Sequence, residues 1–235
     1  IMRFHGVTPR EPWAYSRYAV SVYKFYAWLR ENLLKYSVHT AEEAHKTGIP
    51  MMRPLPIVFP NDKEAVYWED EYFYGSDLLV APVHQEGEKR RIYFPSGSWI
   101  NLLDFRKMVG GNRIFQVDVP IDKIPVYIRE GACILSVMNG ELQLGQSMTY
   151  EKKNTVLMSR ALNETSGKRY ADEKEIEYNI LGQTGEDFFM LRHASETEFI
   201  VLLGFDRKPE SLELNGVSLS EGASLNALNY GSGWY

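Results

Sequence analysis

A nine-residue stretch at residues 75–83, GSDLLVAPV, combines turn-forming residues with an apolar run. Gly75 and Asp77 favour a turn, Leu78–Ala81 is wholly apolar, and Pro82 cannot continue a strand in the middle of a sheet. A short apolar run between turn residues is typical of a buried strand. We therefore expect the centre of this chain to be a β-sheet.

The residues after this stretch also favour strands. Phe115, Val117 and Val119 alternate with Gln116 and Asp118, as in a strand with one buried face. Further short apolar runs are typical of strands, and they occupy residues 91–95, 124–131, 155–158, 176–178, 188–191 and 199–203.

A hairpin signal lies near the end of the sequence. Asn215-Gly216 separates two short apolar segments, and this dipeptide is the preferred loop of a two-residue hairpin. The last third of the chain therefore also predicts an antiparallel β-structure.

The residues before the central stretch predict a helix. Ser16 is a suitable N-cap and Gly48 a suitable left-handed stop. Thr40 and Glu43 have capping-box spacing, which predicts a break in the helix near Val38. Apolar residues recur at three- and four-residue steps and share one face: Tyr18, Val22, Phe25, Leu29 and Leu33.

A proline-rich segment, residues 48–62, separates this helix from the strands. Its four prolines exclude a helix interior or a central strand. Arg53 lies within it, and we interpret this side chain as half of a buried ion pair rather than as a ligand-binding group.

The first residues carry the most unusual chemistry. Residues 2–6 (MRFHG) and 8–13 (TPREPW) bring cations, an imidazole and an indole together in a segment stiffened by proline. This composition suits a polar site in an aromatic-lined loop. The alternative interpretation is structural: Arg3 and Arg10 pair with acids, and Trp13 fills a core.

These motifs resemble glycoside hydrolase family 31, the α-glucosidase and α-xylosidase family. MRFHG and REPW resemble the region after the eighth strand of the family's catalytic (β/α)8 barrel, and Met52-Arg53-Pro54 and GSDLLVAPV resemble the segments that follow. The resemblance implies that His5 hydrogen-bonds the sugar in the −1 subsite, and that Arg3 supports the same wall. The sequence departs from the family pattern at three positions: Lys35 replaces a proline, Ser76 is inserted, and Asn101 replaces an aspartate.

The resemblance is clear to about residue 135 and implies a mostly β fold with three parts. Residues 1–65 would form the C-terminal end of the barrel, contributing the last strand loop and helix. Residues 66–138 would form a proximal β-sandwich and residues 139–235 a distal one, both antiparallel. The chain would then be part of a longer protein, and the rest of the barrel would precede it.

Composition narrows the classes of function. The chain has 235 residues and a net charge of −5, and no basic cluster is long enough to suggest nucleic-acid binding. No apolar run approaches the ~20 residues of a membrane span. Cys133, the single cysteine, lies among apolar residues and is expected to be a buried, inert thiol. His39 and His45 lack ligands at metal spacing, so we expect both at the surface or the core edge, and we expect no metal or cofactor.

The resemblance implies a retaining α-glycosidase that hydrolyses terminal α-linked glucosides or xylosides of oligosaccharides. Such enzymes need two carboxylates about 5 Å apart. No acid here has a setting that predicts this role, so we expect the catalytic pair upstream and the isolated chain to be inactive. The sequence does not separate hydrolysis from transglycosylation, leaves homo-oligomerisation open, and slightly favours a cytoplasmic location.

A non-catalytic carbohydrate-binding module is the alternative from another class. In such a module, aromatic side chains would stack on sugar rings, and the candidates are Trp68, Tyr72, Tyr74, Trp99 and Trp234. We favour the interpretation that these residues pack in cores and between domains.

Overall fold

The structure is a computed structural model of the chain. It describes residues 7–85, 87, 89–104, 108–139 and 143–148. Beyond residue 148 it describes the backbone of strands only, at residues 154–159, 165–171, 174–183, 186–193, 200–203, 213–214, 217–218, 220–221 and 233–234.

Two helices form most of the first part of the described chain, α1 (Arg17–Asn32) and α2 (Leu34–Thr47). The Ser16 side chain accepts a hydrogen bond from the Ala19 N–H at 3.0 Å, which confirms the predicted N-cap. Gly48 ends α2 with φ 76°, as predicted. Short helical turns precede and follow them: η1 (Pro12–Ala14), α3 (Leu55–Val58) and η2 (Ala65–Tyr67).

The predicted break near Val38 is wrong, because the helix breaks at Leu33. Leu33 has φ −89° and ψ 10°, and its buried side chain belongs to the core. Thr40 lies inside α2, where its hydroxyl donates to the Ser37 carbonyl at 2.9 Å and so does not act as a cap. Lys35 occupies the second position of α2, where a proline would also be tolerated.

Six strands form an antiparallel sheet in the order β1-β2-β3-β8-β5-β6. Their bounds are β1 Met52–Pro54, β2 Tyr72–Tyr74, β3 Leu78–Val80, β8 Val126–Arg129, β5 Ser98–Asn101 and β6 Met108–Gly110. The proline-rich segment supplies β1, which lies at the edge of the sheet as its Pro54 requires.

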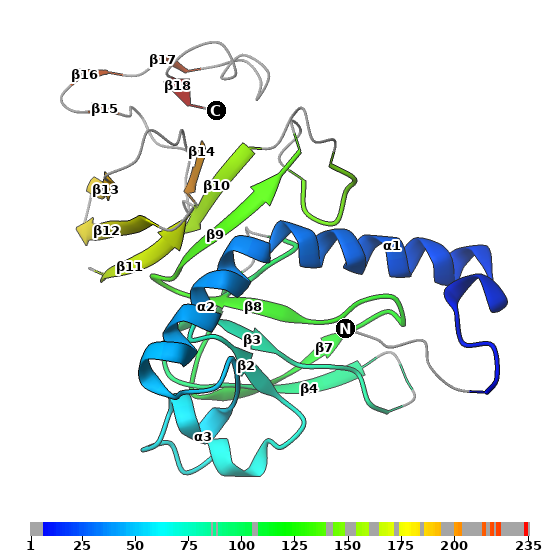
Figure 1. Cartoon of the computed structure of the whole chain (residues 1–235). Coiled ribbons are helices and arrows are strands. Elements are labelled where there is room, and N and C mark those ends of the chain that lie inside the picture. The colour runs from blue at the N-terminus through cyan, green and yellow to red at the C-terminus, as the bar shows by residue number, and fades with distance from the viewer. Residues whose placement is uncertain are drawn as a thin grey trace.

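Strands β4 (Lys89–Phe94) and β7 (Arg113–Asp118) pair antiparallel and pack on one face of this sheet. Helices α1 and α2 pack on the opposite face (Figure 1). The central strands therefore have two buried faces, which explains why residues 78–81 are apolar without alternation.

Each central strand sends successive side chains to opposite cores. Leu78 and Ile128 join the helix-side core, and Leu79 and Tyr127 join the core beneath β4 and β7. The indole of Trp99 is fully buried in the second core, and its N–H donates to the Pro95 carbonyl at 2.9 Å. The helix-side core also contains buried residues of α1, α2, β5 and β9: Leu29, Leu33, Tyr36, Ile100, Ile134 and Met138.

A second group of strands begins with β9 (Cys133–Met138), which contains the buried Cys133. β9 pairs antiparallel with β10 (Asn154–Ser159), so hydrogen bonds cross the predicted domain boundary at residue 138. β10 also pairs with β14 (Ile200–Leu203), and this pair is parallel, which departs from the purely antiparallel arrangement that we expected. Figure 1 shows α1 and α2 between these strands and the six-stranded sheet.

The remaining strands are described by their backbone. β11 (Thr165–Ala171), β12 (Lys174–Gln183) and β13 (Glu186–His193) form an antiparallel sheet. β15 (Glu213–Leu214) and β16 (Val217–Ser218) pair with Leu214 opposite Val217, the register of the predicted Asn-Gly hairpin. β17 (Ser220–Glu221) pairs parallel with β18 (Gly233–Trp234).

The fold is therefore mostly β, as predicted. The assignment of residues 1–65 to a barrel and the division of the remainder into two sandwiches stay predictions. Among the described residues, no helix combines the length and hydropathy needed to cross a membrane.

Candidate functional site

The predicted site residues Arg3 and His5 lie outside the described residues. Residues 7–16 join this predicted site to α1, and the structure describes them. Pro12 is buried at the start of η1, whereas Trp13 is 71% exposed. The interpretation of Trp13 as a core residue is therefore wrong, and its indole lies on the surface of the described chain.

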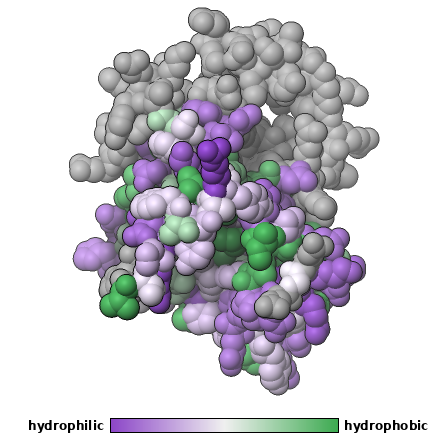
Figure 2. All heavy atoms as spheres, turned by 90° about the vertical axis from the view of Figure 1, so that its right-hand side faces the viewer, coloured by the Kyte–Doolittle hydropathy of each residue, from purple (hydrophilic) through white to green (hydrophobic). Residues whose placement is uncertain are grey.

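This end of the molecule has a chemically mixed surface. Figure 2 shows hydrophobic residues in a few separate patches among hydrophilic ones on the face that carries the N-terminal end of α1. Tyr15 and Tyr18 are exposed there together with Trp13. The apolar face of α1 is thus buried only towards its C-terminal end, where Leu29 reaches the core.

Helix α1 is held by hydrogen bonds at two places along its length. The Tyr26 hydroxyl accepts from the Ile124 N–H at 2.7 Å and donates to the Asp122 carbonyl at 3.1 Å. Near the end of the helix, the Asn32 amide donates to the Val137 carbonyl at 2.7 Å and accepts from the Gly145 N–H at 2.8 Å. The helix that follows the predicted site is therefore fixed to the β-structure by bonds to backbone groups.

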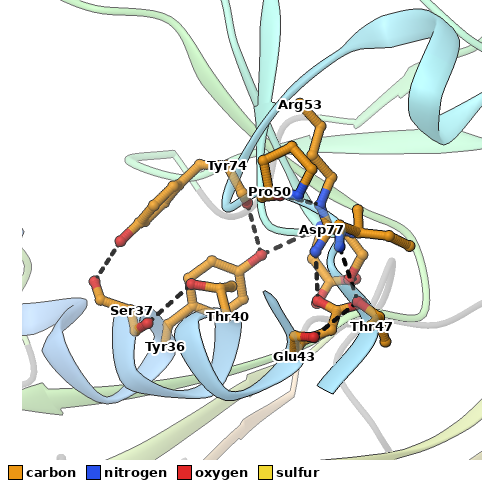
Figure 3. Close-up of polar contacts among 11 residues, drawn as sticks. Tyr36, Ser37, Thr40, Glu43, Thr47, Pro50, Arg53, Tyr74 and Asp77 are labelled. Atoms are coloured by element: carbon orange, nitrogen blue, oxygen red, sulfur yellow. Dashed lines mark hydrogen bonds and ion pairs between the residues drawn. The ribbon is translucent and has the colours of Figure 1, made fainter. Parts of the chain in front are cut away.

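Helix α2 is joined to the turn between β2 and β3 by a network of hydroxyl groups (Figure 3). The Tyr36 hydroxyl donates to the Tyr74 carbonyl at 2.7 Å and accepts from the Asp77 N–H at 3.2 Å. The Tyr74 hydroxyl donates to the Ser37 hydroxyl at 2.6 Å. Gly75 lies between these partners with φ 65°. The GSD sequence thus forms the turn that receives α2.

Arg53 makes the second connection between α2 and the sheet. Its side chain is buried and contacts the Glu43 carboxylate at 2.5 Å, while its Nε donates to the Pro50 carbonyl at 2.8 Å. Figure 3 shows Arg53 and Glu43 facing each other across the loop after α2. The prediction of a buried structural ion pair is confirmed.

The aromatic residues proposed as sugar platforms are mainly packing residues. Trp99 is fully buried, and Tyr74 is bound to α2 through its hydroxyl. Trp68 and Tyr72 are half-buried, and the side chain of Trp234 lies outside the described residues. Asn101 replaces aspartate without loss of the turn, because its Oδ1 accepts from the Leu103 and Asp104 N–H groups, both at 2.9 Å.

Glu71 is a buried acid that sequence reasoning missed. Its side chain is 0% exposed, Oε1 accepts from the Tyr93 N–H at 3.0 Å, and Oε2 has no hydrogen-bond partner. Burial raises its pKa to about 8, against the opposing effects of the Tyr93 N–H and the Arg90 guanidinium. Arg90 lies 3.7 Å from Glu71 and 3.0 Å from Asp70, and Asp70 also contacts His84 at 3.2 Å. A carboxyl enclosed in this way cannot reach a substrate.

We expect Glu71→Gln to stabilise the protein at pH 8. Between pH 4.5 and 8 the folded state retains a proton on Glu71 that the unfolded chain has lost, so stability falls as pH rises through this range. Glutamine keeps the acceptor for the Tyr93 N–H and has no charge to desolvate. The expected gain is roughly 1–3 kcal/mol at pH 8 and vanishes below pH 4.5.

Denaturant unfolding across pH 4–9 measures this difference. Glu69→Gln, at the exposed neighbouring position, is the matched control and should leave the pH profile unchanged. A Glu71→Gln variant less stable than the wild type at pH 8 would show that the charged form of Glu71 is the stabilising one.

The described residues hold no candidate metal site. No group of three or more His, Cys, Asp or Glu side chains in this part of the chain could bind a metal ion. His45 is exposed on α2, and His39 is buried next to Tyr36 rather than at the surface. Among the acids of the described residues, Glu71 has a strongly raised pKa, and its side chain is buried.

A known protein-family model matches the part of the chain that contains the six-stranded sheet. Residues 48–134 match the family model described as the glycosyl hydrolase family 31 C-terminal domain. The chain carries a family 31 C-terminal domain. This domain contains all six strands of the main sheet and the β4–β7 pair, so the predicted resemblance is confirmed.

Individual relatives align with more of this chain than the family model does. An isomaltosyltransferase of Sporosarcina globispora is 28% identical over 255 residues, covering 100% of the chain and 23% of the relative. An α-xylosidase of Saccharolobus solfataricus is 33% identical over 137 residues, covering 57% of the chain and 19% of the relative. The chain thus spans about a fifth of the length of these two enzymes.

A solved structure shows the same fold. The cycloalternan-forming enzyme of Listeria monocytogenes, solved with a pentasaccharide substrate, superposes with a TM-score of 0.84 at 25% identity. The superposition covers 94% of the family 31 chain and 22% of that enzyme. The superposed part of the chain therefore includes strands beyond residue 138 as well as the family 31 domain.

Proposed function

We propose that this chain is the C-terminal part of a retaining α-glycosidase that acts on oligosaccharides with α-linked glucosyl units. The single observation that carries the proposal is the family 31 match over residues 48–134, since homologues of this family are glycoside hydrolases and transglycosidases. The catalytic carboxylates of such an enzyme would lie outside this chain. The described residues would then support the active site and not perform the bond cleavage.

In this proposal His5 and Arg3 form one wall of the −1 subsite. His5 would donate a hydrogen bond to a ring hydroxyl, and this bond would strengthen as charge develops on the sugar in the transition state. The segment from Val7 to Ser16 leads from His5 directly into α1. Because Tyr26 and Asn32 hold α1 to the β-structure, these residues would keep the loop that carries His5 in place.

Transglycosylation is the second candidate, and one observation favours it. The isomaltosyltransferase aligns along the whole chain, whereas the α-xylosidase aligns over 57% of it. Both reactions proceed through a covalent glycosyl-enzyme intermediate and differ in whether water or a sugar hydroxyl attacks it.

Product analysis of the full-length protein tests the proposal. The protein is incubated with isomaltotriose, maltotriose and an α-xyloside, and the products are separated by chromatography. Release of glucose alone indicates hydrolysis, and formation of longer saccharides indicates transfer. If no substrate is converted, the enzyme proposal is wrong and a non-catalytic carbohydrate-binding role becomes the better account.

A further inference from the structure

The two ends of α1 are held in different ways. Residues 17–24, the half that follows the predicted −1 subsite in the chain, are all exposed or half-buried. The buried residues of α1 are Leu29 and Asn32, in its other half. Core packing therefore holds the C-terminal half of α1 more firmly than the half that continues from His5.

The loop that joins β7 to β8, residues 119–125, contacts α1 through the Tyr26 hydroxyl. This hydroxyl donates to the Asp122 carbonyl at 3.1 Å and accepts from the Ile124 N–H at 2.7 Å. One side chain thus uses both its donor and its acceptor on backbone groups of the loop. The loop lies within the family 31 domain, so Tyr26 joins this domain to α1.

Two further contacts lie on either side of Asp122 in this interface. The Tyr18 hydroxyl, about two helical turns before Tyr26, hydrogen-bonds to the Asp122 carboxylate. The Lys123 ammonium lies 5.3 Å from the centroid of the Phe25 ring. The contacts of the loop therefore extend along α1 towards its N-terminal end.

The loop is itself fixed to the β-structure. The Lys123 N–H donates to the Pro120 carbonyl at 2.9 Å and closes a turn, and the Ala81 N–H after β3 donates to the Pro125 carbonyl at 3.0 Å. Val119 is buried at the other end of the loop. A loop anchored at both ends can transmit the position of the sheet to the helix that it contacts.

We infer that Tyr26 is a positioning residue for the glycosidase reaction, because its hydroxyl joins this loop to the helix whose N-terminal end continues from His5. The inference rests on the proposed function for the role of His5. It gives the family 31 domain a part in the reaction: the loop 119–125 holds α1, and α1 with residues 7–16 holds His5 at the sugar.

Tyr26→Phe in the full-length protein tests this inference, because phenylalanine keeps the ring and removes both hydrogen bonds. A displaced His5 would lose the bond that is strongest in the transition state. We therefore expect kcat for an aryl α-glucoside to fall about 3- to 30-fold with KM nearly unchanged. Tyr67→Phe, at an exposed tyrosine on η2, is the matched control and should keep the kcat of the wild type.

A double-mutant cycle with His5→Ala separates positioning from a general structural effect. If Tyr26 acts through His5, its replacement has no further effect once His5 is absent, and the double variant should have the kcat of His5→Ala alone. If Tyr26→Phe lowers kcat by the same factor in both backgrounds, Tyr26 acts independently of His5 and the inference is wrong.

Hydrogen exchange of the same full-length variants gives a readout that does not need activity. The amides of residues 7–24 should exchange faster in Tyr26→Phe than in the wild type and Tyr67→Phe. Unchanged exchange there overturns the inference and leaves the proposed function standing. Absence of turnover by the wild type would instead contradict the proposed function, and the exchange result alone would then decide whether Tyr26 holds this segment.

Discussion

His5→Ala in the full-length protein should lower kcat/KM about 30- to 1000-fold. This factor corresponds to a loss of ~2–4 kcal/mol of transition-state stabilisation. In the proposed active site, His5 donates a hydrogen bond that is strongest in the transition state. Its loss should therefore reduce the rate far more than it reduces fold stability. Steady-state kinetics on an α-glucoside, combined with a thermal melt of the same variant, measures both effects.

The structure decides which histidine is the proper control. His39 is buried against Tyr36, so its replacement would disturb the joint between α2 and the sheet. His45 is exposed near the end of α2, and His45→Ala should leave both kcat/KM and the melting temperature nearly unchanged. If His5→Ala lowers the melting temperature while the folded fraction keeps normal kinetics, His5 is a structural residue and the structural interpretation of this loop is correct.

Gly75→Ala should destabilise the protein by about 3–5 kcal/mol. Gly75 has φ 65°, a conformation that costs an alanine roughly 1 kcal/mol. An added Cβ would also overlap with the Tyr36 hydroxyl and the Thr40 methyl group. Tyr36 cannot move away without weakening its hydrogen bonds to Tyr74 and Asp77, so overpacking adds about 1–3 kcal/mol and the loss of one of these bonds about 1 kcal/mol.

Gly48→Ala separates the two causes. Gly48 has a similar φ of 76°, but an added Cβ there would meet no atom within 4 Å. We therefore expect a loss of only about 1 kcal/mol at position 48. Urea unfolding of both variants gives the comparison. Equal losses at the two positions would mean that α2 does not pack on the β2–β3 turn as the structure shows.

Features that depend on a few neighbouring residues could be predicted from the sequence. Ser16 as N-cap and Gly48 as helix stop follow from local hydrogen bonding and from the φ that glycine tolerates. The buried strand at Leu78 follows from its apolar neighbours, and the Asn215-Gly216 hairpin from the turn that this pair prefers. The buried ion pair of Arg53 was also predicted, although its partner Glu43 was not identified.

Features that depend on distant packing could not be predicted. The helix breaks at Leu33, whose side chain lies in a core shared with Leu78 and Ile134, far along the chain. The parallel pairing of β14 with β10 has no local signal. Glu71 reads as an ordinary acid in the sequence, and its raised pKa arises from burial beneath β4. The candidate site was inferred from the motif around His5, which lies outside the described residues.

The most direct test of the account compares the turnover of aryl α-glucosides by the isolated 235-residue chain and by the full-length protein. NMR identifies the anomer of the sugar that is released first. We expect the full-length protein to release the α-anomer first, as a retaining enzyme does, and the isolated chain to show no turnover. Turnover by the purified isolated chain would contradict the account, because the catalytic carboxylates would then have to lie within it.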